Sequence, residues 1–151
     1  MTIKTVNQLA TGLLFALFSL TAQATTPIKI DGYTVHFNAF NSDTLPPNMA
    51  KAYDIVRSKN RGMFTLSVMK DDPGVSPIGK PVHARVKASA TNLAGQLRDF
   101  TVREIDEGDA IYYISVFHIS AEETLAFDIQ IAPEDGSKPF AVKFRQKFYT
   151  R

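Results

Sequence analysis

Hydrophobic and polar residues alternate along most of the chain with a period of two, which is typical of half-buried β-strands. Six segments show this alternation: residues 33–41, 63–70, 82–89, 97–106, 125–132 and 140–149. A further segment, residues 110–119, is apolar on both faces, which indicates a strand in the middle of a sheet. The pattern therefore predicts about seven strands.

Turn residues separate these segments. Asp72 to Gly74 (DPG) closes one strand, and Glu107-Gly108 predicts a tight hairpin over residues 106–109. Asp135-Gly136 predicts a second hairpin between Pro133 and Phe140. Short strands at such regular spacing are typical of an all-β sandwich or barrel.

One segment has a helical pattern instead. Two prolines and Asn48, a suitable N-cap, precede an apolar stripe at i, i+3, i+4 and i+7: Met49, Ala52, Tyr53 and Val56. This predicts a helix of two or three turns between the first and second strands. The expected fold is an all-β, immunoglobulin-like β-sandwich with one short helix, and a small closed β-barrel is the alternative.

The first 24 residues have the layout of a secretory signal peptide. Lys4 precedes an apolar run at residues 9–20, and Ala22-Gln23-Ala24 supplies a small-x-small cleavage site. We expect cleavage after Ala24, a single domain at residues 25–151, and a location in the periplasm of a Gram-negative bacterium. The apolar run is shorter than the roughly 20 residues of a spanning helix, so we expect no stable membrane insertion after cleavage.

Composition excludes several function classes. The formal net charge of +2 falls to +1 when Lys4 is removed with the predicted signal peptide, and this balance is not the basic surface that binds nucleic acid. The chain has no cysteine, which excludes disulfides, thiolate metal sites and a cysteine nucleophile. An exported domain of this kind has to be held together by burial alone.

Several longer stretches resemble a known family: YTVHFNAFNSDTL, AKAYDIVRSKNRG, the segment from ATNLAGQ through REIDEGDAIYYI to AFDIQIAP, and the ending KFRQKFYTR. They are similar to an uncharacterised family of exported bacterial proteins, domain of unknown function 4426, over essentially all of residues 25–151. The resemblance implies an all-β periplasmic domain. The family carries no assigned activity, so no residue inherits a role from it.

Residues that carry chemistry are sparse. His36, His83 and His118 lack a second ligand at the short spacings of zinc sites, so we expect no metal and no cofactor. His83 is expected to be solvated and His118 to lie in the core. The acidic run at residues 104–109 is expected to be a solvated turn rather than a calcium loop. No serine lies in a Gly-x-Ser-x-Gly setting, and we predict that the chain is not an enzyme.

The candidate binding residues are Arg57, Lys59, Arg61, Asn92, Gln96 and Arg103. The first three form a basic cluster after the predicted helix, and the two amides share the loop ATNLAGQ. The alternative is a purely structural role. The cations would then lie at a helix C-terminus, where the helix dipole favours them, and the amides would hydrogen-bond the backbone of their own loop.

The leading functional prediction is a non-catalytic domain that binds a protein or another envelope component. Sandwich edges accept an added strand. The carboxy-terminal segment KPFAVKFRQKFYT, which includes the last predicted strand, carries four cations that either protect an edge or steer an acidic partner: Lys138, Lys143, Arg145 and Lys147. The competing prediction is a small-ligand-binding protein or hydrolase with a cleft near residues 57–61 and 92–96. The sequence does not predict an oligomeric state.

Overall fold

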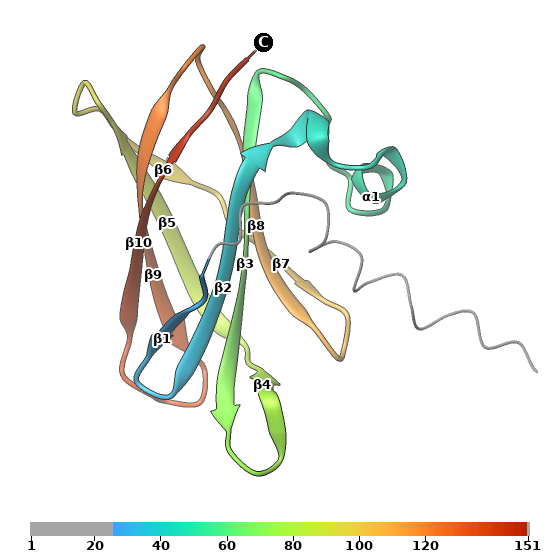
Figure 1. Cartoon of the computed structure of the whole chain (residues 1–151), viewed down its shortest axis with the longest axis vertical. Coiled ribbons are helices and arrows are strands. Elements are labelled where there is room, and N and C mark those ends of the chain that lie inside the picture. Colours follow the sequence, from blue (N-terminus) through green and yellow to red (C-terminus); the bar gives the residue numbers. More distant parts are fainter. Residues whose placement is uncertain (1–25, 151) are drawn as a thin grey trace, which may run out of the picture.

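The computed structural model describes residues 26–150 as two antiparallel sheets packed face to face (Figure 1). The six-stranded sheet runs β1 (Ile28–Ile30), β2 (Tyr33–Asn41), β3 (Arg61–Asp72), β8 (Ile111–His118), β7 (Arg103–Asp106), with β4 (Ser76–Pro81) also paired to β3. The four-stranded sheet runs β10 (Phe140–Lys147), β9 (Thr124–Pro133), β5 (Ala84–Asn92), β6 (Leu97–Phe100). The predicted β-sandwich is confirmed, and the two sheets do not close into a barrel.

The strands outnumber the seven or so that the pattern predicts. Residues 97–106, predicted as one strand, form β6 and β7, which belong to different sheets. The alternation continues across the crossing at residues 101–102, so it does not reveal the change of sheet. The other two additional strands are β1, which has three residues, and β4, which contains Pro77, Gly79 and Pro81 and has no buried residue.

The predicted helix between the first two long strands is confirmed, but its details differ. After the 3-10 helix η2 (Ser42–Thr44), α1 spans only Pro47–Ala52. Asn48 is not the N-cap, because Pro46 occupies that position. Pro47 lies in the first turn, where a backbone N–H has no partner within the helix, so a proline costs no hydrogen bond there. Val56 is 60% exposed, so the expected apolar stripe ends at Tyr53.

The main core lies between the sheets and is centred on Phe127. Its ring is 4.8 Å from that of Phe144 in a stacked arrangement and 6.0 Å from that of Phe64, edge to face. Burial of such side chains contributes about 1.5–3 kcal/mol each, and it stabilises a domain that has no disulfide. Close packing also explains Gly62 of β3, because an added Cβ there would lie 2.6 Å from the Phe117 ring.

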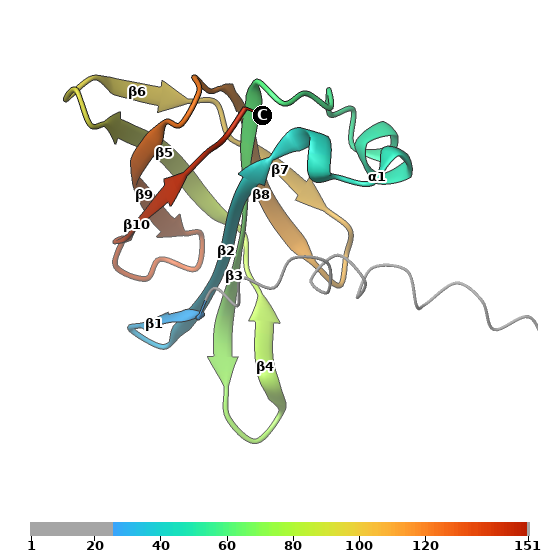
Figure 2. The ribbon, with the colours of Figure 1, turned by 45° about the horizontal axis from the view of Figure 1, so that its top comes forward.

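A second apolar cluster lies on the outer face of the six-stranded sheet. We call residues 42–55, which include η2 and α1, the covering segment. Leu45, Ala50 and Ile55 of this segment are buried together with Met63 and Ile114 of the sheet. Figures 1 and 2 agree that α1 lies on the side of this sheet away from β5, β9 and β10.

His118, expected in the core, is exposed at the end of β8, so that expectation is wrong. The predicted signal peptide lies outside the described residues. Within residues 26–150, neither helix has the length and apolarity that a bilayer-crossing helix requires.

Candidate binding sites

The predicted basic cluster lies in the connection between α1 and β3. Arg57 donates from Nη2 to the backbone oxygen of Asp43 at 2.7 Å. The backbone oxygen of Lys59 accepts a 3.1 Å hydrogen bond from Nδ2 of Asn41, and Arg61 begins β3 opposite His118. The three cationic side chains are exposed. Arg57 therefore stabilises the covering segment through a hydrogen bond, although its side chain is exposed.

The predicted amide pair closes the β5–β6 hairpin. Asn92 donates from Nδ2 to Oε1 of Gln96 at 2.7 Å, and its Oδ1 accepts from the backbone nitrogens of Ala94 and Gln96, both at 3.0 Å. Figure 1 shows this hairpin at the same end of the molecule as residues 57–61, but on the other sheet. The Asn92 and Gln96 side chains thus hydrogen-bond within their own loop, as the structural alternative predicts.

Arg103 begins β7 and donates from Nη2 to the backbone oxygen of Tyr53. It links the edge strand of the six-stranded sheet to the end of α1. Two of the predicted cations therefore hold the covering segment in place, Arg57 near its start and Arg103 near its end. A groove lies between this segment and the sheet.

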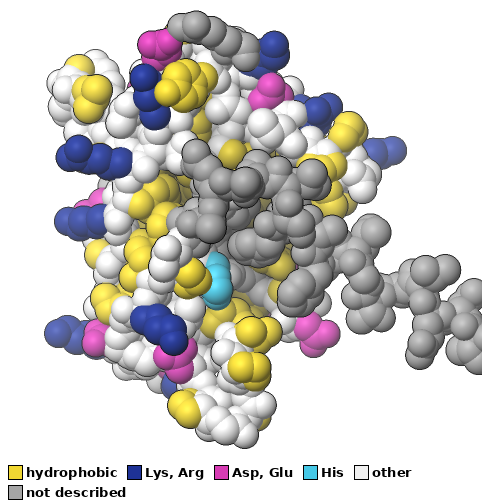
Figure 3. Space-filling model, viewed as in Figure 1, with side chains coloured by type: hydrophobic (Ala, Val, Ile, Leu, Met, Phe, Trp, Pro, Cys, Tyr) yellow, Lys and Arg dark blue, Asp and Glu magenta, His cyan; other side chains and the backbone are white. Residues whose placement is uncertain are grey.

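This groove is a largely apolar hollow of about 80 Å³. Its lining comes from the covering segment, β2, β3, β7 and β8: His36, Asn38, Phe40, Leu45, Met49, Tyr53, Ile55, Met63, Thr65, Leu66, Ser67, Ile105, Tyr112 and Ile114. On the face seen in Figure 3, most charged side chains lie toward the outline, with hydrophobic side chains visible between them. None of the six predicted site residues lines this groove.

Part of the groove lining is polar. His36 lies opposite Ser67, and Asn38 lies opposite Thr65, in the register of β2 with β3. These four side chains alternate with core-facing residues, so they share the outer face of the sheet. Burial lowers the pKa of His36, which keeps the imidazole neutral at physiological pH and able both to donate and to accept a hydrogen bond.

The groove lining also contains two phenols, those of Tyr53 and Tyr112. Burial, followed by the hydrogen bond from its hydroxyl to Glu107, raises the pKa of Tyr53 to about 12. Burial also raises the pKa of Tyr112, with a smaller contribution from the charge of Glu107. Both hydroxyls therefore stay protonated at physiological pH, and that of Tyr53 already donates its proton to Glu107.

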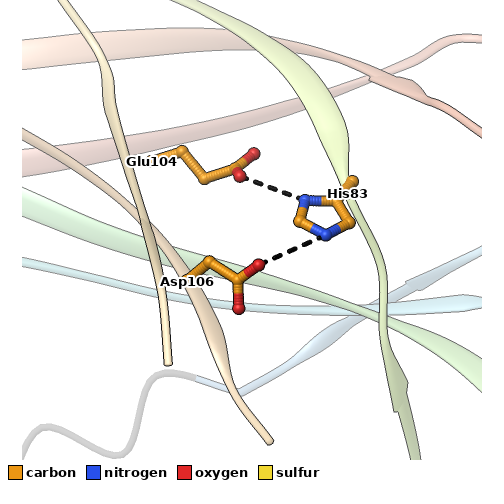
Figure 4. Close-up of side chains that lie close together, drawn as sticks. All are labelled: His83, Glu104 and Asp106. Carbon is orange, nitrogen blue, oxygen red and sulfur yellow. Dashed lines mark hydrogen bonds and ion pairs between the residues drawn. The ribbon is translucent and has the colours of Figure 1, made fainter. Parts of the chain in front are cut away.

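A second candidate site, the histidine–carboxylate cluster of His83, Glu104 and Asp106, lies at an edge of the sandwich (Figure 4). Nδ1 of His83 is 3.0 Å from Oε1 of Glu104, and Nε2 is 3.4 Å from Oδ2 of Asp106. The side chains are 36–47% exposed. His83 was expected to be solvated, and it is exposed, but it is also paired with two carboxylates.

The sequence contained part of the signal for this cluster. Glu104 and Asp106 are two residues apart on a strand, so they share one face. Their partners in β8, Tyr113 and Ile111, are core residues, so both acidic side chains lie on the inward side of the edge strand β7. Nothing local places His83, which belongs to the crossing between β4 and β5, beside them. Only the packing of the two sheets does so.

The cationic last strand, β10, is an edge of the four-stranded sheet. Within residues 26–150 it pairs only with β9. Lys143, Arg145 and Lys147 are exposed on it, and Lys143 is 3.2 Å from Asp128 of β9. Lys138 precedes the strand and is also exposed. Cations along an edge oppose uncontrolled strand pairing.

These features define an all-β sandwich domain with one apolar groove on an outer face and one mixed nitrogen–oxygen cluster at an edge. The model of the family described as Domain of unknown function (DUF4426) matches residues 28–151, and the chain belongs to this family. The resemblance seen in the sequence is thereby confirmed. No curated protein matches the chain.

Solved structures agree with this assignment. A DUF4426 family protein from Pseudomonas aeruginosa PAO1 is 34% identical, with a TM-score of 0.68 over 82% of this chain and 94% of that one. A copper-bound variant of FetP from uropathogenic Escherichia coli is 10% identical, with a TM-score of 0.58. FetP as isolated after expression in the periplasm is 13% identical, with a TM-score of 0.57. Both FetP matches cover 82% of this chain and 93% of that one, and they show the fold alone.

Proposed function

We propose that this chain is a non-catalytic binding domain of the bacterial periplasm, and that its groove accepts a large apolar side chain from an extended segment of a partner protein. The observation that carries the proposal is the apolar hollow on the outer face of the six-stranded sheet. An outer face is normally polar in a sandwich, because it meets water.

The size of the hollow favours a side chain over a whole ligand. Pockets that bind drug-sized ligands have volumes of roughly 300–1,000 Å³, whereas this groove offers about 80 Å³. One water needs roughly 10–15 Å³ on the same kind of measure, so the groove matches a few waters or one large apolar side chain. This comparison favours the protein-binding hypothesis over the small-ligand alternative.

The lining suits a polypeptide. Met49 and Met63 have flexible, polarizable side chains that adapt to differently shaped apolar groups. In the polar part of the lining, Asn38, Thr65 and Ser67 offer donors and acceptors to the backbone of a bound segment. An apolar anchor flanked by backbone hydrogen bonds is the usual way in which a domain reads an extended peptide.

The periplasmic part of the proposal is supported by two observations. The first 24 residues have the composition of a signal peptide. The structurally similar FetP was expressed in the periplasm. A domain without cysteine is compatible with that oxidising compartment, because it has no thiol to protect.

Amide-resolved NMR tests the groove directly. N-acetyl-phenylalaninamide should shift the resonances of groove residues with saturable binding, at a dissociation constant of roughly 1 mM, and N-acetyl-glycinamide should not. Met49→Glu, which places a carboxylate beside the lining, should weaken binding at least about 10-fold, since a charge in an apolar site has to be desolvated. Shifts that do not saturate, or that lie on the four-stranded sheet, contradict the proposal.

The matched control is Val56→Glu. It introduces the same carboxylate just after the covering segment, but at a side chain that is 60% exposed and outside the groove. Binding of N-acetyl-phenylalaninamide should change by less than about 2-fold, as expected of a surface substitution. Equal losses in the two variants would show a general electrostatic effect and would contradict a site at Met49.

Crosslinking in intact cells tests the partner. A photoreactive amino acid at position 49 should capture a protein in the wild-type background, and the same group at position 145, on the edge strand β10, should not. Adducts formed only from position 145 would show that the partner binds at the edge strand and would contradict binding in the groove. Adducts with lipid instead of protein from position 49 would overturn the proposed class of partner.

A further inference from the structure

We propose that the histidine–carboxylate cluster of His83, Glu104 and Asp106 binds one divalent first-row transition-metal ion. Each residue offers one ligand atom, and these three atoms all lie within 4.8 Å of one another. This inference is independent of the proposed groove, from which all three residues are absent.

The position of the imidazole is the strongest observation. Its two ring nitrogens each face a carboxylate oxygen, Glu104 at 3.0 Å and Asp106 at 3.4 Å. A neutral imidazole has only one N–H, so one of these two contacts sets a nitrogen lone pair against a carboxylate oxygen. A cation between them removes this repulsion. The cluster is therefore satisfied either by a second proton on His83 or by a metal ion.

The charge of the cluster matches a divalent ion. Two carboxylates contribute two negative charges, and neutral His83 contributes none. A divalent ion neutralises them while the imidazole stays uncharged, whereas a proton leaves one negative charge. Metal ligands bind in their deprotonated form, so an ion and a second proton on His83 compete for this cluster.

The backbone around the cluster is held in place before any ion binds. Glu104 lies opposite Tyr113 in the pairing of β7 with β8. The backbone nitrogen of Ala84 donates to the Tyr113 hydroxyl at 2.7 Å, and the backbone oxygen of His83 accepts from Glu134 at 2.9 Å. The crossing that carries His83 is thus tied to both sheets, and ligands held in this way lose little freedom on binding.

The donor set selects the kind of ion. Ca²⁺ and Mg²⁺ prefer ligands that are all oxygen, whereas an imidazole nitrogen with two carboxylates suits Zn²⁺, Cu²⁺ or Mn²⁺. Three protein ligands at an exposed edge leave coordination positions for water, as in open zinc sites. Affinity should follow the order Cu²⁺ > Zn²⁺ > Mn²⁺.

A purely structural explanation makes the opposite prediction. Inward-pointing charges on a short edge strand such as β7 prevent edge-to-edge association. If Glu104 and Asp106 serve only that purpose, the cluster has no selective affinity for a transition metal. Removing His83 would then leave metal binding unchanged.

Isothermal titration of the untagged protein at neutral pH decides between the two. With ZnCl₂ we expect one ion per chain, and CaCl₂ should bind at least about 10-fold more weakly. His83→Ala, and separately Glu104→Gln with Asp106→Asn, should each lower the Zn²⁺ affinity by roughly 10-fold or more, since even groups that only orient a ligand cost that much. With Cu²⁺, the electron paramagnetic resonance spectrum should show coupling to a single imidazole nitrogen.

His118→Ala is the matched control, because it removes an exposed histidine on β8 that lies outside the cluster. It should leave Zn²⁺ affinity unchanged. Circular dichroism of each metal-free variant separates lost binding from lost folding, and Glu104→Gln preserves the shape of the side chain. Binding that persists in His83→Ala, that falls equally in His118→Ala, or that is weaker than about 1 mM in the folded wild type overturns the proposal.

Discussion

The outer faces of the two sheets differ sharply, although both are built from strands of alternating pattern. On the four-stranded sheet the outer face carries Arg85, Lys87 and Lys143, all exposed, and Lys143 pairs with Asp128. On the six-stranded sheet the outer face carries Met63 and Ile114, which are only 1% and 5% exposed. One face meets water, and the other is covered.

The covering segment causes this difference. It is inserted between β2 and β3 and returns over the outward residues of the sheet, where Leu45 and Ile55 are buried. Because α1 is only six residues long, it does not cover the whole face, and the groove remains. A short insertion has thus turned an ordinary sheet surface into a candidate binding site, while the other sheet kept a charged surface.

The largest expected effect tests the covered face. Met63→Ala should lower the free energy of unfolding by about 3 kcal/mol, because it removes a buried side chain beneath the covering segment. Lys87→Ala, at an outward position of the other sheet, should change it by less than about 0.5 kcal/mol. Urea titration followed by circular dichroism measures both. Similar losses in the two variants would erase the contrast between the faces.

The second largest expected loss of stability concerns the core between the two sheets. The ring of Phe144 on β10 stacks at 4.3 Å on Phe37 of β2 and at 4.8 Å on Phe127, yet it is only half-buried. Phe144→Ala should therefore cost about 2 kcal/mol, less than the roughly 3–5 kcal/mol of a fully buried ring. The same denaturant titration gives the value. A loss of unfolding free energy of roughly 3–5 kcal/mol or more would show that β10 is covered in solution.

A pH dependence sharpens the description of the groove. The Tyr53 phenol ionises near pH 12 in the folded chain and near its ordinary 10.0 when unfolded. Its contribution to stability is complete below pH 10 and is lost as the pH rises from about 10 through about 12, because the unfolded state releases the proton first. The difference in ultraviolet absorbance between wild type and Tyr53→Phe follows this ionisation.

Glu107→Gln separates the causes of that raised pKa. It removes the carboxylate charge and should lower the pKa of Tyr53, while burial, the larger cause, keeps the pKa above its ordinary value. Asp109→Asn, at an exposed position of the same hairpin, is the control and should leave the titration of Tyr53 unchanged. An unchanged pKa in Glu107→Gln would mean that the hydrogen bond does not persist in solution.

The smallest expected effect lies on the charged face. Lys143 is 3.2 Å from Asp128, but its side chain is 72% exposed. Lys143→Ala should change the free energy of unfolding by about 0.5 kcal/mol or less, because water and salt screen such a pair. Thermal melting at low and high salt measures the difference. A larger loss would give this face a structural importance that its exposure does not indicate.

Much of the fold could be predicted from the sequence. The alternation around Phe127 and the Glu107-Gly108 turn predicted core strands and a hairpin that the structure confirms. The change of sheet at residues 101–102 could not be predicted, because the period of two is the same in either sheet. His118 was wrongly placed in the core, since apolar neighbours on both faces do not show that the end of the strand is open to water.

The candidate sites could be predicted only in part. Arg57 and Arg103 were singled out for their charge, but the structure shows them fastening the covering segment to its surroundings. The groove residues, such as Met63 and Ile114, have no local signal, because an outward methionine on a strand looks the same whether covered or not. The roles of Lys59, Arg61, Asn92 and Gln96 in binding stay predictions.

By itself, the sequence determined a β-sandwich without disulfides and a core of alternating apolar residues, because strand periodicity and turn chemistry are local properties that burial then enforces. Only the tertiary structure decided which sheet face the covering segment packs on. It also decided that His83 lies beside Glu104 and Asp106 of the edge strand β7. His83 is 21 residues from Glu104 along the chain. Their meeting follows from how two sheets pack, and no local pattern encodes that distance.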